Sequence, residues 1–452
     1  MVNRLGWFGG ALLCWLVCGM VRADTVVQEC TLVPAKKGAV FFHPDGTSAG
    51  HWDAMRLLYY GPDGRSHWDR MPRMAAYRGH LTDRMSATSN AGASIHATGT
   101  RTWSGAFGRD EQGAKLRAAD GTDRTIMEQA VICGLGTALV QTGTLVEPGT
   151  AAFVANAGNR YRDAESIALQ VIESGVDILL GAGEEWLLPS GMQGHFGPGR
   201  RTDGRNLIDE ARKRGYAVVY TRAELLALDP DVDKVLGVFA LEDTYNDLPE
   251  ESLKEHGLPF YDEQAPTVAE MTAFALERIA RNPNGYFAVV EEEGTDNFCN
   301  RQNAAGCLTA LKRADEAVAY LLDFVEAHPE AFVLMASDSN AGGMQISEVE
   351  SADQPVPERE ARTGALLDGR EGTATLPFLS AADRHGRRFP FAIAWAVGDD
   401  VGSGVIVRAA GHDAARLLPG TTLVNTEVYR ILYRQLFGRW IDADAELQPQ
   451  RR

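Results

Sequence analysis

Short apolar runs alternate with helical patterns along most of the chain, and this alternation restricts the fold more than any other feature. The runs cover residues 39–42, 138–141, 177–180, 217–220, 234–240, 286–290, 332–336, 391–396 and 404–407. Strands that are apolar throughout, rather than alternating with polar residues, are typical of a sheet with helices on both faces. The sequence therefore predicts an α/β fold with a large, mainly parallel sheet.

Two of the expected helices are marked by apolar residues at helical spacing. One opens at Pro266 and the other covers the region around residue 318. Their apolar positions are Val268, Met271, Ala275 and Ile279 in the first, and Leu311, Val318, Leu321, Leu322 and Val325 in the second. We interpret both stripes as core faces, so they carry no functional prediction.

Residues 340–388 have a different composition, with acids, bases, glycines and prolines and little periodicity. Such a segment predicts an irregular excursion from the sheet. It would either cap an active site or decorate an edge, and we favour the cap. The chain shows no internal repeat and no low-complexity tract, so residues 24–452 are expected to form a single catalytic domain.

The first 23 residues predict export. Arg4 is followed by an uncharged, mostly apolar stretch at residues 5–21, and small or branched residues follow at a cleavage position. The stretch is shorter than the roughly 20 residues that span a bilayer. We interpret residues 1–23 as a signal peptide, with an uncleaved anchor as the alternative, and expect a periplasmic or secreted protein that does not remain in a membrane.

The net charge limits the possible partners. The whole chain carries a formal charge of −17, which becomes −19 once Arg4 and Arg22 leave with the signal. A polyanion would be repelled by such a surface, so nucleic acid is not an expected partner. An anionic substrate is still compatible with this charge, because bound divalent cations reverse it locally.

Four cysteines remain after the signal: Cys30, Cys133, Cys299 and Cys307. An exported compartment permits disulfides, and four thiols allow three pairings. Cys299 with Cys307 is the local candidate, and buried free thiols are the alternative.

Polar residues that follow the apolar runs point to a metal site. Ligand sites in parallel sheets lie beyond the carboxyl ends of the strands. The residues found there are Asp45, Glu291, Glu292, Glu293, Asp296, Asp338 and His412. Each alone is compatible with a helix cap or a turn. Together they would repel one another unless cations lay between them, so they predict a multinuclear metal centre.

A second signal lies at residues 88–102, which are rich in hydroxyls and small side chains and continue as a helix. Backbone N–H groups at a helix start favour an approaching phosphate. Ser89 at this position is either a nucleophile or an ordinary capping serine.

The run around Ser89, which ends Ala-Thr-Gly-Thr-Arg-Thr-Trp-Ser-Gly-Ala-Phe-Gly, resembles the nucleophile segment of alkaline phosphatases. Residues 147–160, 266–296, 314–318 and 410–415 resemble further segments of that family in the same order. The similarity spans roughly residues 37–437. It implies an alkaline phosphatase-like sandwich, hydrolysis of small phosphate monoesters through a phosphoserine, and a possible homodimer.

The resemblance also implies a role for individual residues. Ser89 matches the nucleophile, with Thr88 as the alternative hydroxyl, and Arg160 matches the arginine that clamps two phosphate oxygens. The implied metal ligands are Asp45 as the bridging carboxylate, Glu291 at the third (magnesium) site, Asp296 and His412 at the first zinc, and Asp338 at the second zinc.

Several positions depart from the family pattern. Asn300 and Ser339 stand where the family has histidines, Glu147 stands where it has an aspartate or histidine, and Gly149 replaces a hydroxyl ligand. Loss of imidazoles shifts the metal preference from zinc towards magnesium, manganese or calcium. Glu292, Glu293 and His43 are candidate replacements, although at least one of the two glutamates is expected to be solvated.

Two other functions remain open. Residues 46–50, Gly-Thr-Ser-Ala-Gly, have the G-x-S-x-G form of a serine-esterase elbow, but the sequence offers no histidine partner. The two missing histidines are also compatible with a non-catalytic member of the family, which would bind phosphate or metal without hydrolysing a substrate.

Overall fold

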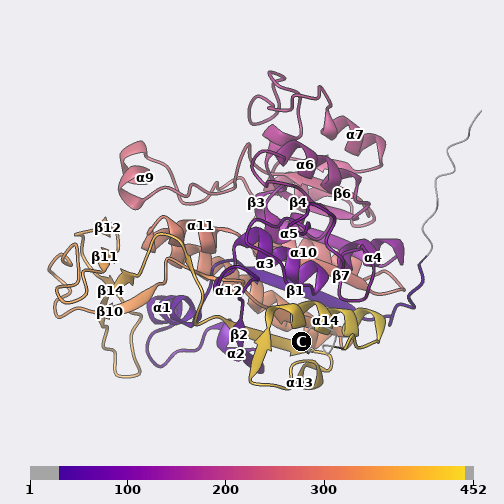
Figure 1. The fold of residues 1–452 in the computed structure, drawn as a ribbon. Coiled ribbons are helices and arrows are strands. Elements are labelled where there is room, and N and C mark those ends of the chain that lie inside the picture. Colours follow the sequence, from indigo (N-terminus) through magenta and orange to yellow (C-terminus); the bar gives the residue numbers. More distant parts are fainter. Residues whose placement is uncertain (1–29, 443–452) are drawn as a thin grey trace, which may run out of the picture.

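The computed structural model describes residues 30–442, so the expected signal peptide lies outside the described residues. Within this range, ten strands form one sheet whose spatial order is β17-β2-β16-β8-β1-β7-β3-β4-β6-β5 (Figure 1). Its strands are β1 (Gly38–Pro44), β2 (Arg73–Arg78), β3 (Gly136–Thr144), β4 (Ile178–Ala182), β5 (Ala217–Val219), β6 (Val235–Val238), β7 (Tyr286–Glu292), β8 (Ala331–Met335), β16 (Ile406–Gly411) and β17 (Thr422–Val424). The α/β prediction is confirmed.

Strand direction in this sheet has one exception. Strands β1, β3, β4, β5, β6, β7 and β8 pair in parallel, whereas β16 pairs antiparallel with both β8 and β2. The run at 404–407 was expected to behave like the others. Because β16 is reversed, the residues that follow it leave the sheet at the opposite edge.

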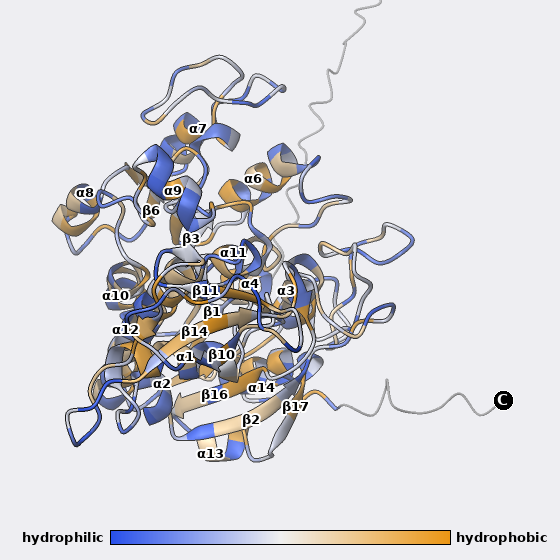
Figure 2. Cartoon of the chain, turned by 90° about the vertical axis from the view of Figure 1, so that its left-hand side faces the viewer, coloured by the Kyte–Doolittle hydropathy of each residue, from blue (hydrophilic) through white to orange (hydrophobic). Residues whose placement is uncertain are grey.

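Helices cover both faces, as the apolar strands require. On β1, Phe41 faces a core layer that includes α3 (Ser89–Thr98), α4 (Ile126–Ile132), α6 (Ala164–Glu173), α7 (Leu207–Lys213) and α14 (Asn425–Phe437). The next residue, Phe42, faces a second layer formed by α1 (Ala49–Tyr60), α10 (Val268–Ile279) and α12 (Ala304–Ala327). Figure 2 shows apolar colour on the central strands and polar colour on the peripheral loops and helices.

Both predicted helical stripes are present, as α10 and the 24-residue α12. Helix α10 begins with a capping box in which Thr267 and Glu270 satisfy each other's backbone N–H groups. The shorter helices are α2 (His67–Arg70), α5 (Pro148–Ala151), α8 (Arg222–Ala227), α9 (Glu250–His256), α11 (Gly294–Asn300), α13 (Ala414–Leu417) and the 3-10 turn η1 (Glu184–Trp186).

The excursion at 340–388 is less irregular than expected. It contributes to a small, mostly antiparallel sheet made of β10 (Gln345–Glu348), β11 (Leu366–Gly369), β12 (Gly372–Thr373), β13 (Phe378–Leu379) and β14 (Pro390–Trp395). The run at 391–396 belongs to this sheet and not to the main one. Strands this short give little periodicity in the sequence, which is why they were missed. In Figure 1 this sheet lies beside α1, at one end of the molecule.

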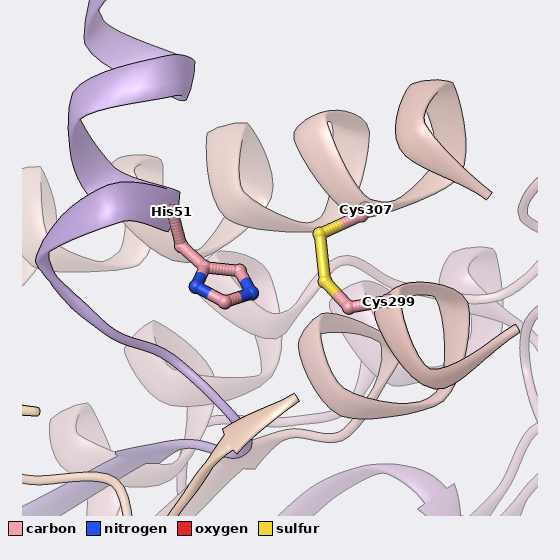
Figure 3. Close-up of side chains that lie close together, drawn as sticks. All are labelled: His51, Cys299 and Cys307. Carbon is pink, nitrogen blue, oxygen red and sulfur yellow. A yellow bond between two sulfur atoms is a disulfide. The ribbon is translucent and has the colours of Figure 1, made fainter. Parts of the chain in front are cut away.

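Two disulfides are present, Cys30–Cys133 and Cys299–Cys307. The local pairing is therefore as predicted, and the alternative of free thiols is wrong. The second bridge ties α11 to the start of α12 beside His51 (Figure 3). Among the described residues, no helix combines the length and the apolar character that crossing a membrane requires.

Candidate metal centre and nucleophile

Carboxylates from three neighbouring strands meet at one edge of the sheet. Strand β1 lies between β7 and β8 and is parallel to both, so Asp45 after β1, Glu291 in β7 and Asp338 after β8 leave the sheet on the same side. All three are almost completely buried. Asp296, on α11 just after β7, lies against Gly46, since a Cβ there would come within 2.6 Å of its Oδ1. The predicted convergence of these four acids is confirmed.

The oxygens of this cluster lack ordinary partners. Within residues 30–442, no hydrogen bond reaches Asp45 Oδ2, Glu291 Oε1, Glu293 Oε2 or either carboxylate oxygen of Asp338. Buried polar atoms are otherwise nearly always hydrogen-bonded, because desolvation without a partner is unfavourable. Unpaired carboxylate oxygens that face one another are the donor set of a cation site, and the residues therefore fit the divalent ions expected from the sequence.

Electrostatics support the same conclusion. Burial, followed by repulsion from Asp45 and Glu147, raises the pKa of Glu291 to about 8, although His43 acts in the opposite direction. Burial and the charges of neighbouring carboxylates also raise the pKa of Glu293, Asp296 and Asp338 well above the usual range. Such a cluster is strongly destabilised as a set of bare anions, and positive charge placed among them would relieve the repulsion.

Two glutamates after β7 have different roles. Glu293 is buried within the cluster, with its Oε2 unpaired among the described residues, and forms a compact group with Asp45 and Asp296. Glu292 is also buried, but its Oε1 accepts hydrogen bonds from Thr142 and Tyr261, both at 2.8 Å. The expectation that at least one of the pair is solvated is wrong.

Ser89 is the first residue of α3 and lines a pocket of about 420 Å³ at this edge of the sheet. One turn later on the same helix face lies Gly92, where a Cβ would come within 2.4 Å of Asp338 Oδ2. The helix therefore packs Ser89 close to the acid cluster. The neighbouring hydroxyl of Thr88 donates to Ser104 O at 2.8 Å, which engages it and favours Ser89 as the reactive hydroxyl.

Arg160 lines the same pocket as Ser89. Its guanidinium lies 3.5 Å from Glu147, the residue just before α5, and stacks 4.7 Å from the Tyr161 ring. Burial alone would lower the pKa of Arg160, but the charges of Glu147, Glu293, Asp296 and Tyr161 act together in the opposite direction and raise it, so the group stays cationic. Glu147 thus contacts the arginine directly, and it also contributes to the negative potential around Glu291.

Asn300 does not occupy the position of a metal ligand. Its Nδ2 donates to Asp296 Oδ1 at 3.0 Å and to Asp400 Oδ1 at 3.1 Å, while its Oδ1 accepts from Gly342 N at 3.0 Å. The backbone N–H of Gly342 fixes the orientation of the amide, so the donor end faces the carboxylates. The predicted ligand role is therefore incorrect, and Asn300 instead holds two acids together.

His412 does not lie with the acids, although the family resemblance implied that it is a metal ligand. Its backbone N–H donates to Ala331 O, and Ala331 is the first residue of β8 and pairs with Gly38, the first residue of β1. His412 thus lies at the opposite edge of the sheet from Asp45, which follows the last residue of β1. The reason is the reversed direction of β16, which the apolar pattern does not reveal.

Asp400 takes the place that His412 was expected to fill. It lies in β15 (Asp400–Val401), which pairs with β9 (Asn340–Ala341), and β9 begins two residues after Asp338. Burial and the charge of Asp45 raise the pKa of Asp400, and burial and the charge of Asp400 are the leading causes of the raised pKa of Asp296. The sequence signal was the Gly398-Asp399-Asp400 turn after an apolar run, which also borders the pocket.

The esterase alternative is not supported. Ser48 does have a histidine partner, since its Oγ lies 2.9 Å from His51 Nδ1, but both side chains are buried. Ser48 N also donates to the same ring nitrogen, so the pair caps α1. His51 in turn lies beside Cys299 and Cys307, whose sulfurs are bonded to each other and are not thiolate ligands (Figure 3).

Comparison with known proteins bears on the family of this chain. Residues 36–367 match the family model described as alkaline phosphatase. The repressible alkaline phosphatase of Saccharomyces cerevisiae is 26% identical over 71% of this chain and 57% of its own length. The streptomycin-6-phosphate phosphatase of Streptomyces griseus is 27% identical over 74% of this chain and 81% of its own.

Solved structures agree on the fold. The alkaline phosphatase of Thermus thermophilus superposes with a TM-score of 0.69 at 20% identity, covering 95% of this chain and 96% of that one. Some curated relatives are longer, and the chain matches only about half to three fifths of their length. Because the family model matches well over half of the sequence, the chain belongs to the alkaline phosphatase family.

Proposed function

We propose that the protein hydrolyses small phosphate monoesters through a phosphoserine at Ser89. The observation that carries the proposal is the position of Ser89, which opens α3 one turn before Gly92, at the point where this helix touches Asp338 of a buried, unpaired acid cluster. Family membership supports the same reaction class.

The ions would be held in three groups of side chains. Asp45 and Asp338 form one, Asp296 and Asp400 form another, and Glu291 with Asp45 forms a third, which the ring of His43 also borders. The first two offer only oxygen donors, which suits Mg²⁺, Mn²⁺ or Ca²⁺ better than Zn²⁺. Bound cations would neutralise the acids, lower the pKa of the Ser89 hydroxyl and attract the anionic substrate.

The protein groups then perform a two-step transfer. Ser89 Oγ attacks phosphorus, a new Oγ–P bond forms, and the bond to the ester oxygen breaks, so that the alcohol leaves with a proton. Water next cleaves the Oγ–P bond and releases inorganic phosphate. Arg160, which stays charged, would bind two of the phosphate oxygens in a bidentate manner and orient phosphorus for in-line attack.

Export and oligomeric state belong to the same proposal. The two disulfides support an oxidising compartment, in agreement with a periplasmic or secreted enzyme. A homodimer is what the family resemblance predicts, and sedimentation of the purified protein would test it.

The test uses purified protein that is stripped with a chelator and then given single divalent ions. We expect hydrolysis of p-nitrophenyl phosphate to disappear on chelation and to return with Mg²⁺ or Mn²⁺. Incubation with radiolabelled phosphate and acid quenching should trap label on the wild type and on Thr88→Ala, but not on Ser89→Ala. Activity that survives chelation, or label that survives in Ser89→Ala, would refute the proposal. Metal binding without any turnover would favour the non-catalytic alternative.

A further inference from the structure

A buried histidine lies inside the acid cluster and takes no part in the mechanism above. His43 is in β1, two residues before Asp45, and is fully buried. Its Nδ1 lies 2.7 Å from Ala336 O. A carbonyl oxygen only accepts hydrogen bonds, so Nδ1 must carry the proton. In the neutral ring, Nε2 then carries no proton, and its lone pair is available to a cation or a hydrogen-bond donor.

That lone pair faces two carboxylates. Nε2 lies 3.2 Å from Asp45 Oδ1 and 3.8 Å from Glu291 Oε1. Despite these distances, Nε2 and Glu291 Oε1 make no hydrogen bond within the described part of the chain. An imidazolium would be expected to aim an N–H at one of the oxygens. Here Nε2 makes no such bond, and each of the three side chains places one ligand atom within 4.8 Å of the other two.

The spacing suits ligands that share one ion. Nitrogen and oxygen ligands bound at roughly 2.0–2.2 Å lie about 2.8–3.6 Å from their neighbours in octahedral or tetrahedral geometry. One ligand atom from each of His43, Asp45 and Glu291 lies within 4.8 Å of the others, and His43 Nε2 lies 3.2 Å from Asp45 Oδ1. The 3.8 Å between His43 Nε2 and Glu291 Oε1 exceeds this range by only about 0.2 Å.

The groups behind these ligands are already in place. Ala336 O fixes the ring of His43, Gly46 N donates to Asp45 Oδ1 at 2.8 Å, and Gln141 Nε2 donates to Glu291 Oε2 at 2.6 Å. Partners of this kind orient metal ligands and fix the tautomer of a coordinating histidine. They leave Glu291 Oε1 and His43 Nε2 3.8 Å apart and without hydrogen-bond partners among the described residues.

We propose that His43, Asp45 and Glu291 form a mixed nitrogen and oxygen cation site that selects Zn²⁺ over Mg²⁺ and Ca²⁺. An imidazole ligand favours borderline ions, whereas oxygen donors alone favour hard ones. The centre would then be heterometallic, with the borderline ion at the position where the family resemblance predicted magnesium. The inference rests on the proposed function only in assuming that the acid cluster binds cations.

The test compares His43→Gln with His96→Gln. His96 is a matched control, since it is buried, its ring lies 5.6 Å from that of His43, and its Nε2 is engaged at 2.7 Å by the Tyr77 hydroxyl. Each protein is stripped, loaded with Zn²⁺ in the presence of excess Mg²⁺, dialysed and assayed for metal content. We expect His43→Gln to retain one Zn²⁺ fewer than the wild type and His96→Gln to match the wild type. Loss of a direct ligand should weaken Zn²⁺ binding by more than the roughly 10–100-fold seen for outer partners.

A spectroscopic readout removes the dependence on variant folding. Wild-type protein loaded with Mn²⁺ should show ¹⁴N coupling from a directly bound imidazole in pulsed electron paramagnetic resonance. Absence of that coupling in the wild type, or equal Zn²⁺ content in His43→Gln, would overturn the proposal and indicate an imidazolium in place of the ion. Ser89→Ala should keep both the metal content and the ¹⁴N coupling. Failure of the proposed catalytic role of Ser89 would therefore leave this test of the metal site unaffected.

Discussion

Gly149→Ala is predicted to disable the metal centre with the smallest possible change of side chain. Gly149 lies in α5 with a negative φ, so alanine is compatible with its backbone and would ordinarily favour a helix slightly. The added Cβ, however, would lie 1.6 Å from Glu291 Oε1 and 2.1 Å from its Cδ. Ordinary contact begins at 3.4 Å, so the carboxylate must move by about 1.8 Å.

The magnitude follows from what this movement breaks. Glu291 would lose the 2.6 Å hydrogen bond from Gln141 and its approach to His43. A buried hydrogen bond to a charged group contributes about 1.5–3 kcal/mol. At about 1.4 kcal/mol per factor of ten, this loss weakens cation binding at that position by roughly 10–100-fold.

The assay is titration of stripped protein with a divalent ion, followed by activity and by the increase in melting temperature. Gly420→Ala is the matched control, because its Cβ would find its nearest neighbours at 3.5 and 3.9 Å. We expect the Gly149→Ala midpoint to move to higher ion concentration and the Gly420→Ala midpoint to stay. Equal midpoints in both variants would refute the placement of Glu291 against α5.

Three further predictions follow from named contacts. Arg160→Lys should lower kcat/KM for a monoester by about 100-fold, because lysine cannot bind two phosphate oxygens in a planar fork; a change below threefold would contradict the assignment. Asp400→Asn should weaken metal binding by at least roughly tenfold while His412→Gln leaves it unchanged, and the reverse result would restore the sequence-based ligand. Burial, followed by the charge of Asp368, raises the pKa of Glu250 to about 8 from 4.5. The folded state therefore holds a proton that the unfolded state loses, so its stability falls as pH rises from about 4.5 to 8. Glu250→Gln should then raise the free energy of unfolding above pH 8, by up to about 5 kcal/mol, and have little effect at pH 4.5.

The sequence predicted most of the acids of the site, because the carboxyl ends of parallel strands lie at the same edge of the sheet. Asp45, Glu291 and Asp338 each follow or end an apolar run, and any parallel sheet that places these runs side by side brings them together. The position of Ser89 at a helix start also followed from the sequence, because small and hydroxyl residues surround it. Its role as nucleophile was implied only by the family resemblance and stays a prediction.

The errors have an equally physical origin. An apolar segment such as residues 404–407 has the same composition whether it pairs parallel or antiparallel with its neighbours. The sequence therefore did not reveal that β16 is antiparallel. Burial of Glu293 was equally hidden, because a run of three glutamates is normally solvated and only the packing of α11 encloses it.

What the sequence determined alone is the class of fold, the helices with strong apolar stripes, and the acids at the ends of parallel strands. These depend on local pattern and on the few ways in which apolar strands can be covered. Tertiary structure decided which acids face one another across the site: Asp400 is present and His412 absent because β15 pairs with β9 and β16 is reversed. Strand direction is set by the packing of the whole sheet, and no short stretch of sequence contains that information.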